Sequence, residues 1–264
     1  MVRFFQESKQ MIDTHCHIND KRFDKDINEV ISRSIDSGVE KIICIGTDLK
    51  SSEKAITLSN IYDSVYASIG FHPHDSKDAE QGYIYALEEM ANDKKVVAIG
   101  ETGLDYYYKI SDKNIQKKIF NEQIELAQHK NLPVIMHCRK SSSDLIDILV
   151  HKKLSYGVVH CFSENWNLAS KLLKLNIKLS FTGIITFVKD PFQEVVEKIP
   201  MDDFFIETDS PYLSPHPNRG KRNEPSYVRY VAKHIARIKG ISTEEIIDKT
   251  TENALSFFKK INPN

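Results

Sequence analysis

The chain has 264 residues, of which 41% are hydrophobic and 28% charged, and its 36 basic and 37 acidic residues give a formal net charge of −1. This composition is typical of a soluble globular protein and excludes an overall basic surface, and no stretch approaches the roughly 18 consecutive apolar residues of a membrane span. The first ten residues, MVRFFQESKQ, lack the apolar region of a secretory signal, and the four cysteines do not resemble a disulfide framework. We therefore expect a cytoplasmic protein without membrane contact.

Short runs rich in β-branched residues alternate along the chain with longer amphipathic stretches. The runs predict eight strands, at residues 11–14, 41–46, 65–70, 96–100, 133–137, 157–161, 177–183 and 204–208. Apolar residues spaced by three and four predict helices at residues 25–37, 51–62, 112–130, 143–153, 165–175, 225–239 and 242–260. Ser242 or Thr243 is expected to cap the last helix.

Eightfold alternation of strand and helix is the pattern of a parallel sheet closed into a (β/α)8 TIM-type barrel, and a doubly wound open sheet is the structural alternative. We expect residues 1–10 to form an N-terminal extension and residues 11–264 to form a single domain. The loop at 210–226 is long and rich in proline and basic residues, which is typical of functional or disordered loops.

Histidines and carboxylates follow the predicted strands at the ends where barrel enzymes carry their active sites. These residues are His15 and His17 after the first strand, Glu101 after the fourth, His137 and His160 at the ends of the fifth and sixth, and Asp209 after the eighth. Residues at i and i+2 of a strand point to the same side, so both His15 and His17 can face the barrel axis. The sequence therefore predicts one cluster of six side chains at the mouth of the barrel.

Four imidazoles and two carboxylates are too many ligands for one tetrahedral ion. They suit two divalent cations that share a bridging carboxylate, and Glu101 is the natural bridge because it comes from the opposite side of the barrel to Asp209. Mixed nitrogen and oxygen ligation favours Zn, Mn, Co or Fe and leaves Mg open for a weaker second site.

Six motifs, in this order, resemble those of the TatD family of metal-dependent deoxyribonucleases: DTHCH, GFHPH, AIGETGLDYY, VIMHCRKS, VVHCFS and FFIETDSPYLSPHPNRGKRNEP. The resemblance runs from about residue 11 to residue 258 and implies a distorted (β/α)8 barrel with nuclease activity on DNA. It implies the same six ligands, and it places His72 near the scissile phosphate. In one departure, Glu164 stands where the family usually has glycine, which puts phosphate binding there in doubt. The residues before Met11 have no counterpart in the family.

Within that reading, Glu101, Asp209 and His72 are the expected catalytic residues, and the reaction is hydrolysis of a phosphodiester by a metal-activated water. Asp209 is expected to orient or deprotonate the water, although it could instead cap the turn that follows it. Glu207 is expected to lie behind a ligand histidine and to fix its tautomer.

Substrate contacts are expected from His72, Arg139, Tyr107, Arg219 and Arg222. Arg139 shares a face with His137 and could either clamp a phosphate or form an ion pair with a carboxylate at the mouth. Arg219 and Arg222 would grip the DNA backbone, and one tyrosine of the run 106–108 could stack on a terminal base. For His74, contact with substrate and a structural part in the loop remain equal alternatives.

Two other functions compete with a nuclease. One is a small-molecule amidohydrolase or lactonase on the same barrel, for which a lysine would be typical at the position of Glu101. The other is a nucleic-acid-binding protein with a weak site. Because a protein of net charge −1 does not hold long duplexes by counterion release, we expect single-stranded DNA or strand ends as partners, an exonuclease-like mode, and a monomer or weak oligomer.

Overall fold

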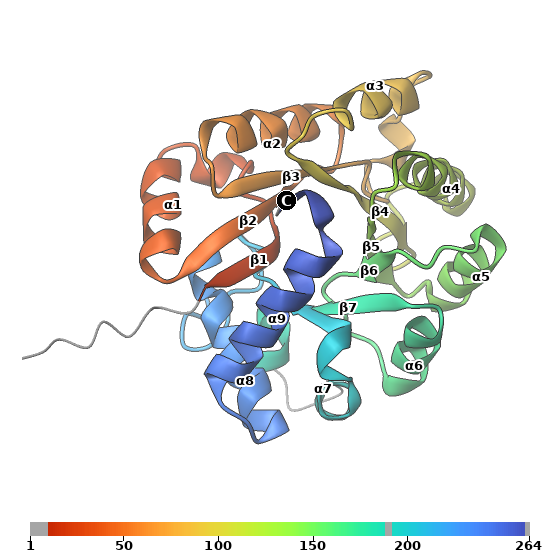
Figure 1. Cartoon of the computed structure of the whole chain (residues 1–264). Coiled ribbons are helices and arrows are strands. Elements are labelled where there is room, and N and C mark those ends of the chain that lie inside the picture. The colour runs from red at the N-terminus through yellow and green to blue at the C-terminus, as the bar shows by residue number, and fades with distance from the viewer. Residues whose placement is uncertain (1–9, 188–191, 262–264) are drawn as a thin grey trace, which may run out of the picture.

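The computed structural model describes residues 10–187 and 192–261. Eight parallel strands lie in the order of the chain around a central axis, and helices surround them (Figure 1). The strands are β1 (Met11–Cys16), β2 (Val39–Ile45), β3 (Val65–Ile69), β4 (Val96–Asp105), β5 (Val134–Arg139), β6 (Gly157–Val159), β7 (Ile177–Phe181) and β8 (Phe204–Ile206). The predicted TIM-type barrel is confirmed.

The helices follow the strands on the outside of the barrel. They are α1 (Ile27–Asp36), α2 (Leu49–Ile61), α3 (Tyr83–Met90), α4 (Lys113–Lys130), α5 (Ser142–Lys152), α6 (Trp166–Lys174), α7 (Gln193–Lys198), α8 (Val228–Lys239) and α9 (Thr243–Phe257). Ser242 caps α9, since its side chain accepts a hydrogen bond from the Glu245 backbone N–H. The short helices α3 and α7 lie outside the expected ranges; neither has a side-chain cap hydrogen bond that a sequence pattern would signal.

Individual hydrogen bonds between β1 and the segment after β8 close the barrel. The backbone N–H of Asp209 donates to the carbonyl of His15 at 2.9 Å, and that of His17 donates to Ser210 at 2.7 Å. Deeper in the barrel, Asp13 accepts from the backbone N–H of Thr208 at 2.9 Å, and burial raises the pKa of Asp13 to about 8. These hydrogen bonds hold the carboxyl end of β1 next to the segment that follows β8.

Helix α9 covers one end of the barrel. In Figure 1 it crosses in front of the strands. Ala254, Phe257, Phe258 and Ile261 pack in one cluster with residues of the barrel interior, namely Ile12, Ile43, Ile45, Tyr66, Val97, Ala98, Ile135, Val158 and Phe205. The carboxyl ends of the strands are therefore the open end of the barrel.

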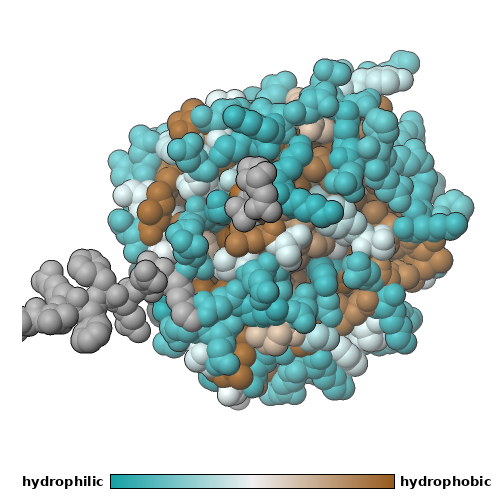
Figure 2. All heavy atoms as spheres, in the orientation of Figure 1, coloured by the Kyte–Doolittle hydropathy of each residue, from teal (hydrophilic) through white to brown (hydrophobic). Residues whose placement is uncertain are grey.

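Hydrophilic side chains cover most of the face on which α9 lies, with hydrophobic ones scattered among them (Figure 2). Among the residues that the structure describes, no helix combines the length and apolar character needed to cross a membrane. Residues 1–9 of the expected N-terminal extension, and residues 262–264 of the expected domain, lie outside the described part of the chain.

Candidate metal centre

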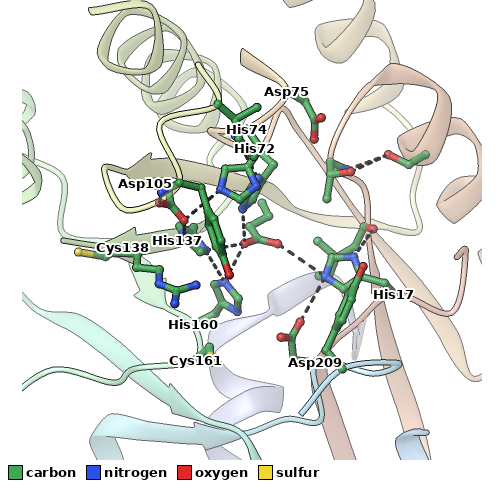
Figure 3. A pocket seen from close by; sticks show the side chains of 18 of the residues that line it. His17, His72, His74, Asp75, Asp105, His137, Cys138, His160, Cys161 and Asp209 are labelled. Carbon is green, nitrogen blue, oxygen red and sulfur yellow. Dashed lines mark hydrogen bonds and ion pairs between the residues drawn. The ribbon is translucent and has the colours of Figure 1, made fainter. Parts of the chain in front are cut away.

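A cavity of about 920 Å³ opens at the carboxyl ends of the strands. Five of the six expected ligands line it: His17, Glu101, His137, His160 and Asp209. Figure 3 shows His17, His72, His137, His160 and Asp209 converging from different elements of the barrel. The sixth, His15, is fully buried beneath them. The structure thus brings all six side chains into one cluster.

Glu101 lies at the centre of this cluster, and its two oxygens face two different sets of imidazoles. Oε2 lies 3.4 Å from His15 Nε2 and 3.7 Å from His17 Nε2. Oε1 lies 2.8 Å from His160 Nε2 and 3.1 Å from His137 Nδ1. A carboxylate with each oxygen turned toward its own group of nitrogens has the geometry of a bridge between two cations.

The donor set fits a metal better than it fits a hydrogen-bond network. The Nε2 atoms of His15 and His17 face each other at 3.3 Å, and His160 Nε2 faces His137 Nδ1 at 3.4 Å. Ring nitrogens gathered in this way around carboxylate oxygens provide lone pairs that a divalent cation can take up. Three groups have ligand atoms close enough to hold an ion: His15, His160 and Asp209; His15, His17 and Glu101; and His72, Glu101 and His137.

An irregular stretch of β4 positions Glu101. The register with β5 shifts between Ile99 and Thr102, and the backbone N–H of Glu101 donates across the barrel wall to the carbonyl of Gly46 at 3.0 Å. Gly100 has φ +142°, and a Cβ there would lie 2.4 Å from the carbonyl oxygen of Ile135, so only glycine fits. The expectation that Glu101 follows the strand is wrong, because β4 continues through it to Asp105.

On the other side of the cluster, Asp209 faces the two histidines of β1. Its Oδ1 lies 3.3 Å from His17 Nε2 and 3.7 Å from His15 Nε2. Asp209 has φ +55°, a left-handed conformation that aspartate tolerates better than most residues, and its backbone N–H is held by His15. The closure of the barrel therefore sets the position of this carboxylate relative to His15 and His17.

Asp105 is a residue of the cluster that the sequence analysis did not single out. Its Oδ2 lies 3.0 Å from His137 Nε2 and 3.1 Å from His74 Nε2, while Oδ1 accepts from the backbone N–H of Tyr107. Nδ1 of His137 is thereby turned toward Glu101. Asp105 lies four residues after Glu101 in the same strand, and residues at this spacing share a face of the strand. This spacing is the feature of the sequence that could have placed Asp105 in the cluster.

His72 lies in the loop after β3, and it reaches further into the cluster than a substrate contact requires. Its Nε2 is 3.3 Å from Glu101 Oε1. Its loop is fixed by Gln123 of α4, which accepts from the backbone N–H of Phe71 at 2.8 Å and donates to the carbonyl of the same residue at 3.1 Å.

Glu207 is fully buried beside His160. Its Oε1 lies 3.4 Å from His160 Nδ1 and accepts from the backbone N–H of Cys161 at 2.8 Å. The other nitrogen of the same ring, Nε2, faces Glu101. This is the arrangement in which a carboxylate orients a ligand histidine from behind.

The imidazoles and carboxylates of the cluster shift one another's pKa values toward the charged forms and so oppose the effect of burial. Burial by itself would raise the pKa of Glu101, but His160 and His72 hold it well below its usual range. Burial would also raise the pKa of Asp209, but the neighbouring histidines, chiefly His17, lower that pKa by a larger amount. The pKa of His160 lies well above its ordinary value because Glu101 and Glu207 overcome its burial. Both carboxylates are therefore ionised, the form in which they bind cations.

The expected substrate contacts separate into two groups. Arg139 lines the cavity, and its guanidinium lies 4.2 Å from the ring centre of Tyr107 and 4.7 Å from that of Tyr108. Among the described residues that line the cavity, Tyr108 is present and Tyr107 is not. Glu164 is not one of these lining residues either, although its neighbour Ser163 is.

Arg219 and Arg222 lie outside the described lining of the cavity. The guanidinium of Arg222 forms two hydrogen bonds to Asp26, at 2.8 and 2.6 Å, and a third to the carbonyl of Arg22. Arg219 lies 3.5 Å above the ring of Phe187. Arg222 therefore fastens the loop that follows β8 to the start of α1 through three hydrogen bonds within the protein.

Comparison with known proteins gives a consistent result. A family model described as "TatD related DNase" matches residues 12–259. The chain is 45% identical over 253 residues to the uncharacterized metal-dependent hydrolase YabD of Bacillus subtilis, covering 94% of this chain and 99% of that protein. It is 31% identical over 258 residues to a protein of Pectobacterium carotovorum named 3'-5' ssDNA/RNA exonuclease TatD, with 94% and 99% covered. The crystal structure of a TatD homologue from Escherichia coli superposes with a TM-score of 0.90 at 28% identity, covering 95% of this chain and 98% of that one.

Proposed function

Since this chain belongs to the family of TatD-related DNases and is a metal-dependent hydrolase, we propose that it hydrolyses phosphodiester bonds of single-stranded DNA from a strand end. The named exonuclease among its relatives supports this substrate class. The observation that carries the proposal is the position of Glu101, whose two oxygens face separate groups of imidazoles. A small-molecule hydrolase of the same fold is the alternative that the experiment below distinguishes.

Two divalent cations, Zn, Mn or Mg, would occupy the cluster. His15, His17 and Asp209 with one oxygen of Glu101 would hold the first. His137 and His160 with the other oxygen would hold the second. When bound, such a pair lowers the pKa of a water toward neutrality and neutralises the charge on the non-bridging oxygens of a phosphate.

The side chains of this chain supply the remaining chemistry. Asp209, whose pKa is lowered by His17 against the effect of burial, would accept a proton from the attacking water and orient it toward phosphorus. His72 and Arg139 face the cavity and would bind the phosphate oxygens. Burial lowers the pKa of His72 to about 4, so His72 is neutral at physiological pH and can donate one hydrogen bond without adding charge.

The proposal is tested by hydrolysis of an end-labelled single-stranded oligonucleotide after treatment with EDTA and after addition of Mg²⁺, Mn²⁺ or Zn²⁺. We expect no cleavage in EDTA, recovery with at least one ion, and products that shorten from one end. Recovery without shortening from an end would overturn the exonuclease mode. If protein shown to bind metal cleaves no DNA but opens lactones or amides, the small-molecule alternative is correct.

Exchange of Glu207 for glutamine is expected to weaken metal binding by about 10- to 100-fold, the usual cost of disturbing a partner behind a ligand histidine. The amide keeps the size of the side chain and can still accept from the Cys161 backbone, so the fold should be retained. Metal affinity measured by isothermal titration calorimetry checks the prediction. An unchanged affinity would show that Glu207 only supports the backbone of Cys161.

Arg139 and Arg222 are expected to differ in the salt dependence of DNA cleavage. Each phosphate neutralised on a single strand contributes about 0.7 to the slope of log affinity against log salt. Arg139→Ala should lower this slope by about 0.7, because the side chain faces the cavity and forms no ion pair with the described residues. Arg222→Ala should leave the slope unchanged, because its guanidinium is bound to Asp26. The measurement is KM for the oligonucleotide at a series of salt concentrations, and the opposite order would reverse the two assignments.

A further inference from the structure

We propose that the rings of Tyr108 and Tyr212, which pack against Arg139 and Arg22 respectively, stack on the bases of the two nucleotides that flank the scissile phosphate. This inference rests on the proposed function and specifies how a single strand would be held. The two pairs come from segments near β4 and β8, which lie on opposite sides of an eight-stranded barrel. They therefore mark two ends of the cavity with the metal-binding cluster between them.

The first pair lies beside His74 and Asp105. Tyr108 lines the cavity and is 53% exposed, which is a large exposure for an aromatic side chain inside a cleft. Its ring stands edge-on to His74, with ring centres 5.4 Å apart. The guanidinium of Arg139 lies 4.2 Å from the ring centre of Tyr107 and 4.7 Å from that of Tyr108, and the two rings stand edge-on with their centres 4.9 Å apart, so these three side chains pack against one another.

The second pair lies beside His17 and Asp209. Tyr212 also lines the cavity, is 48% exposed, and stands edge-on to His17 with ring centres 6.1 Å apart. The guanidinium of Arg22 lies 4.3 Å from its ring centre. The backbone of Tyr212 is held by hydrogen bonds to Asp209 and Asn223, so the loop presents this ring in a defined position.

The charge of the second arginine is already balanced, which points to stacking and not to phosphate binding as the purpose of the pair. Arg22 donates two hydrogen bonds to Asp20, at 2.8 and 2.9 Å. The acidic group beside the cavity is thereby neutralised, while a flat guanidinium remains against the tyrosine. Stacking of bases on aromatic rings is tolerant of sequence because every base has a π-face.

Carboxamide side chains, which can form paired hydrogen bonds with a base edge, are scarce in the described lining of the cavity. Asn19 is the one carboxamide side chain among the described lining residues, and its amide donates to the carbonyls of Ile45 and Ser51 at 2.9 Å each. A substrate held by two aromatic rings and a central phosphate would need two unstacked nucleotides. The geometry thus favours a single strand over a duplex and any base over a particular one.

The experiment combines removal of each tyrosine ring with removal of each base and measures the effect on binding. Binding of a short, hydrolysis-resistant phosphorothioate oligothymidylate is measured by fluorescence anisotropy with metal present. The oligonucleotide is used intact, without the 3′-terminal base, and without the penultimate base. The proteins are the unchanged chain, Tyr108→Ala and Tyr212→Ala, with Tyr85→Ala as a matched control because Tyr85 is 72% exposed and belongs to α3, away from the described cavity lining.

In the unchanged protein, loss of a stacked base should weaken binding about 5- to 140-fold, which corresponds to about 1–3 kcal/mol. Each alanine variant should abolish the effect of removing one base and leave the effect of removing the other, so that the two tyrosines couple to different bases. Tyr108→Phe and Tyr212→Phe should retain the coupling, since the ring is kept.

Additive effects of ring and base, or coupling of both tyrosines to the same base, would overturn the inference. Cleavage of an ordinary oligonucleotide is measured separately. Coupled binding without cleavage would reject the nuclease and retain the stacking sites, whereas cleavage without coupling would do the reverse.

Discussion

Replacing Glu101 by alanine is expected to abolish metal-dependent hydrolysis, with a loss of about 10³-fold or more, the scale seen when a preorganised electrostatic group is removed from an active site. The reason is the double role of this side chain. One oxygen faces His15 and His17 while the other faces His137 and His160, so both proposed cation positions lose a ligand at once. Among the described residues, Glu101 is the one carboxylate of the cluster whose two oxygens contact two different pairs of histidines.

The measurement combines turnover of an oligonucleotide with the number of metal ions bound, determined by elemental analysis after dialysis. Losing a residue that only hydrogen-bonds to a metal ligand typically lowers metal affinity by roughly 10- to 100-fold. Because Glu101 is itself a proposed ligand, its loss should lower the affinity by more than this. Glu40→Ala is the matched control, because Glu40 is an exposed glutamate on β2, away from the cavity. Full metal content in Glu101→Ala would show that Glu101 does not bridge two ions, even if activity were lost.

Phe258→Ala is expected to lower the free energy of unfolding by about 3–5 kcal/mol, the range for removing a buried phenylalanine from a core. Phe258 is fully buried, and its ring lies 5.7 Å from that of Phe205 and 4.9 Å from that of Phe257, measured between ring centres. Through these contacts the end of the chain closes the barrel opposite the cavity. Truncation would leave a void between the C-terminal segment and the interior of the barrel.

Urea unfolding at constant slope provides the measurement, with Ile61→Ala as the control because Ile61 is 63% exposed on α2. Below its melting temperature, the variant should retain metal content and turnover, since the cluster lies at the other end of the strands. A loss of less than about 1 kcal/mol would contradict the view that this residue is part of the core.

The barrel could be predicted from the sequence because the patterns that indicate its strands and helices lie within short segments. β-branched runs and amphipathic stretches repeat often enough to predict every strand, with boundaries wrong by a few residues. The largest error in a strand boundary concerned β4, which continues through Glu101 to Asp105. The glycines at 100 and 103 both have positive φ, and the adjoining backbone of β5 leaves no room for a Cβ at either one. Alternation alone does not predict such an irregular strand.

The partners of the basic residues could not be predicted from the sequence, for a related reason. Arg222 looked like a contact for DNA because it belongs to a basic run next to the cluster. Its partner Asp26 lies 196 positions away in the chain and became visible only in the folded protein. Conversely, Tyr212 carried no signal of its own until the fold placed it beside His17 and Arg22.

The sequence by itself determined which side chains meet, since the identities of the imidazoles and carboxylates and their places in or near the carboxyl-terminal parts of the strands already define a cluster that suits divalent cations. The tertiary structure alone decided which oxygen of Glu101 faces which histidines, which arginine lines the cavity, and which tyrosines border it. The physical reason is that periodicity and ligand type are properties of short segments. Register, strand irregularity and the closure of β1 against the segment after β8 depend on contacts between residues that are distant in the chain.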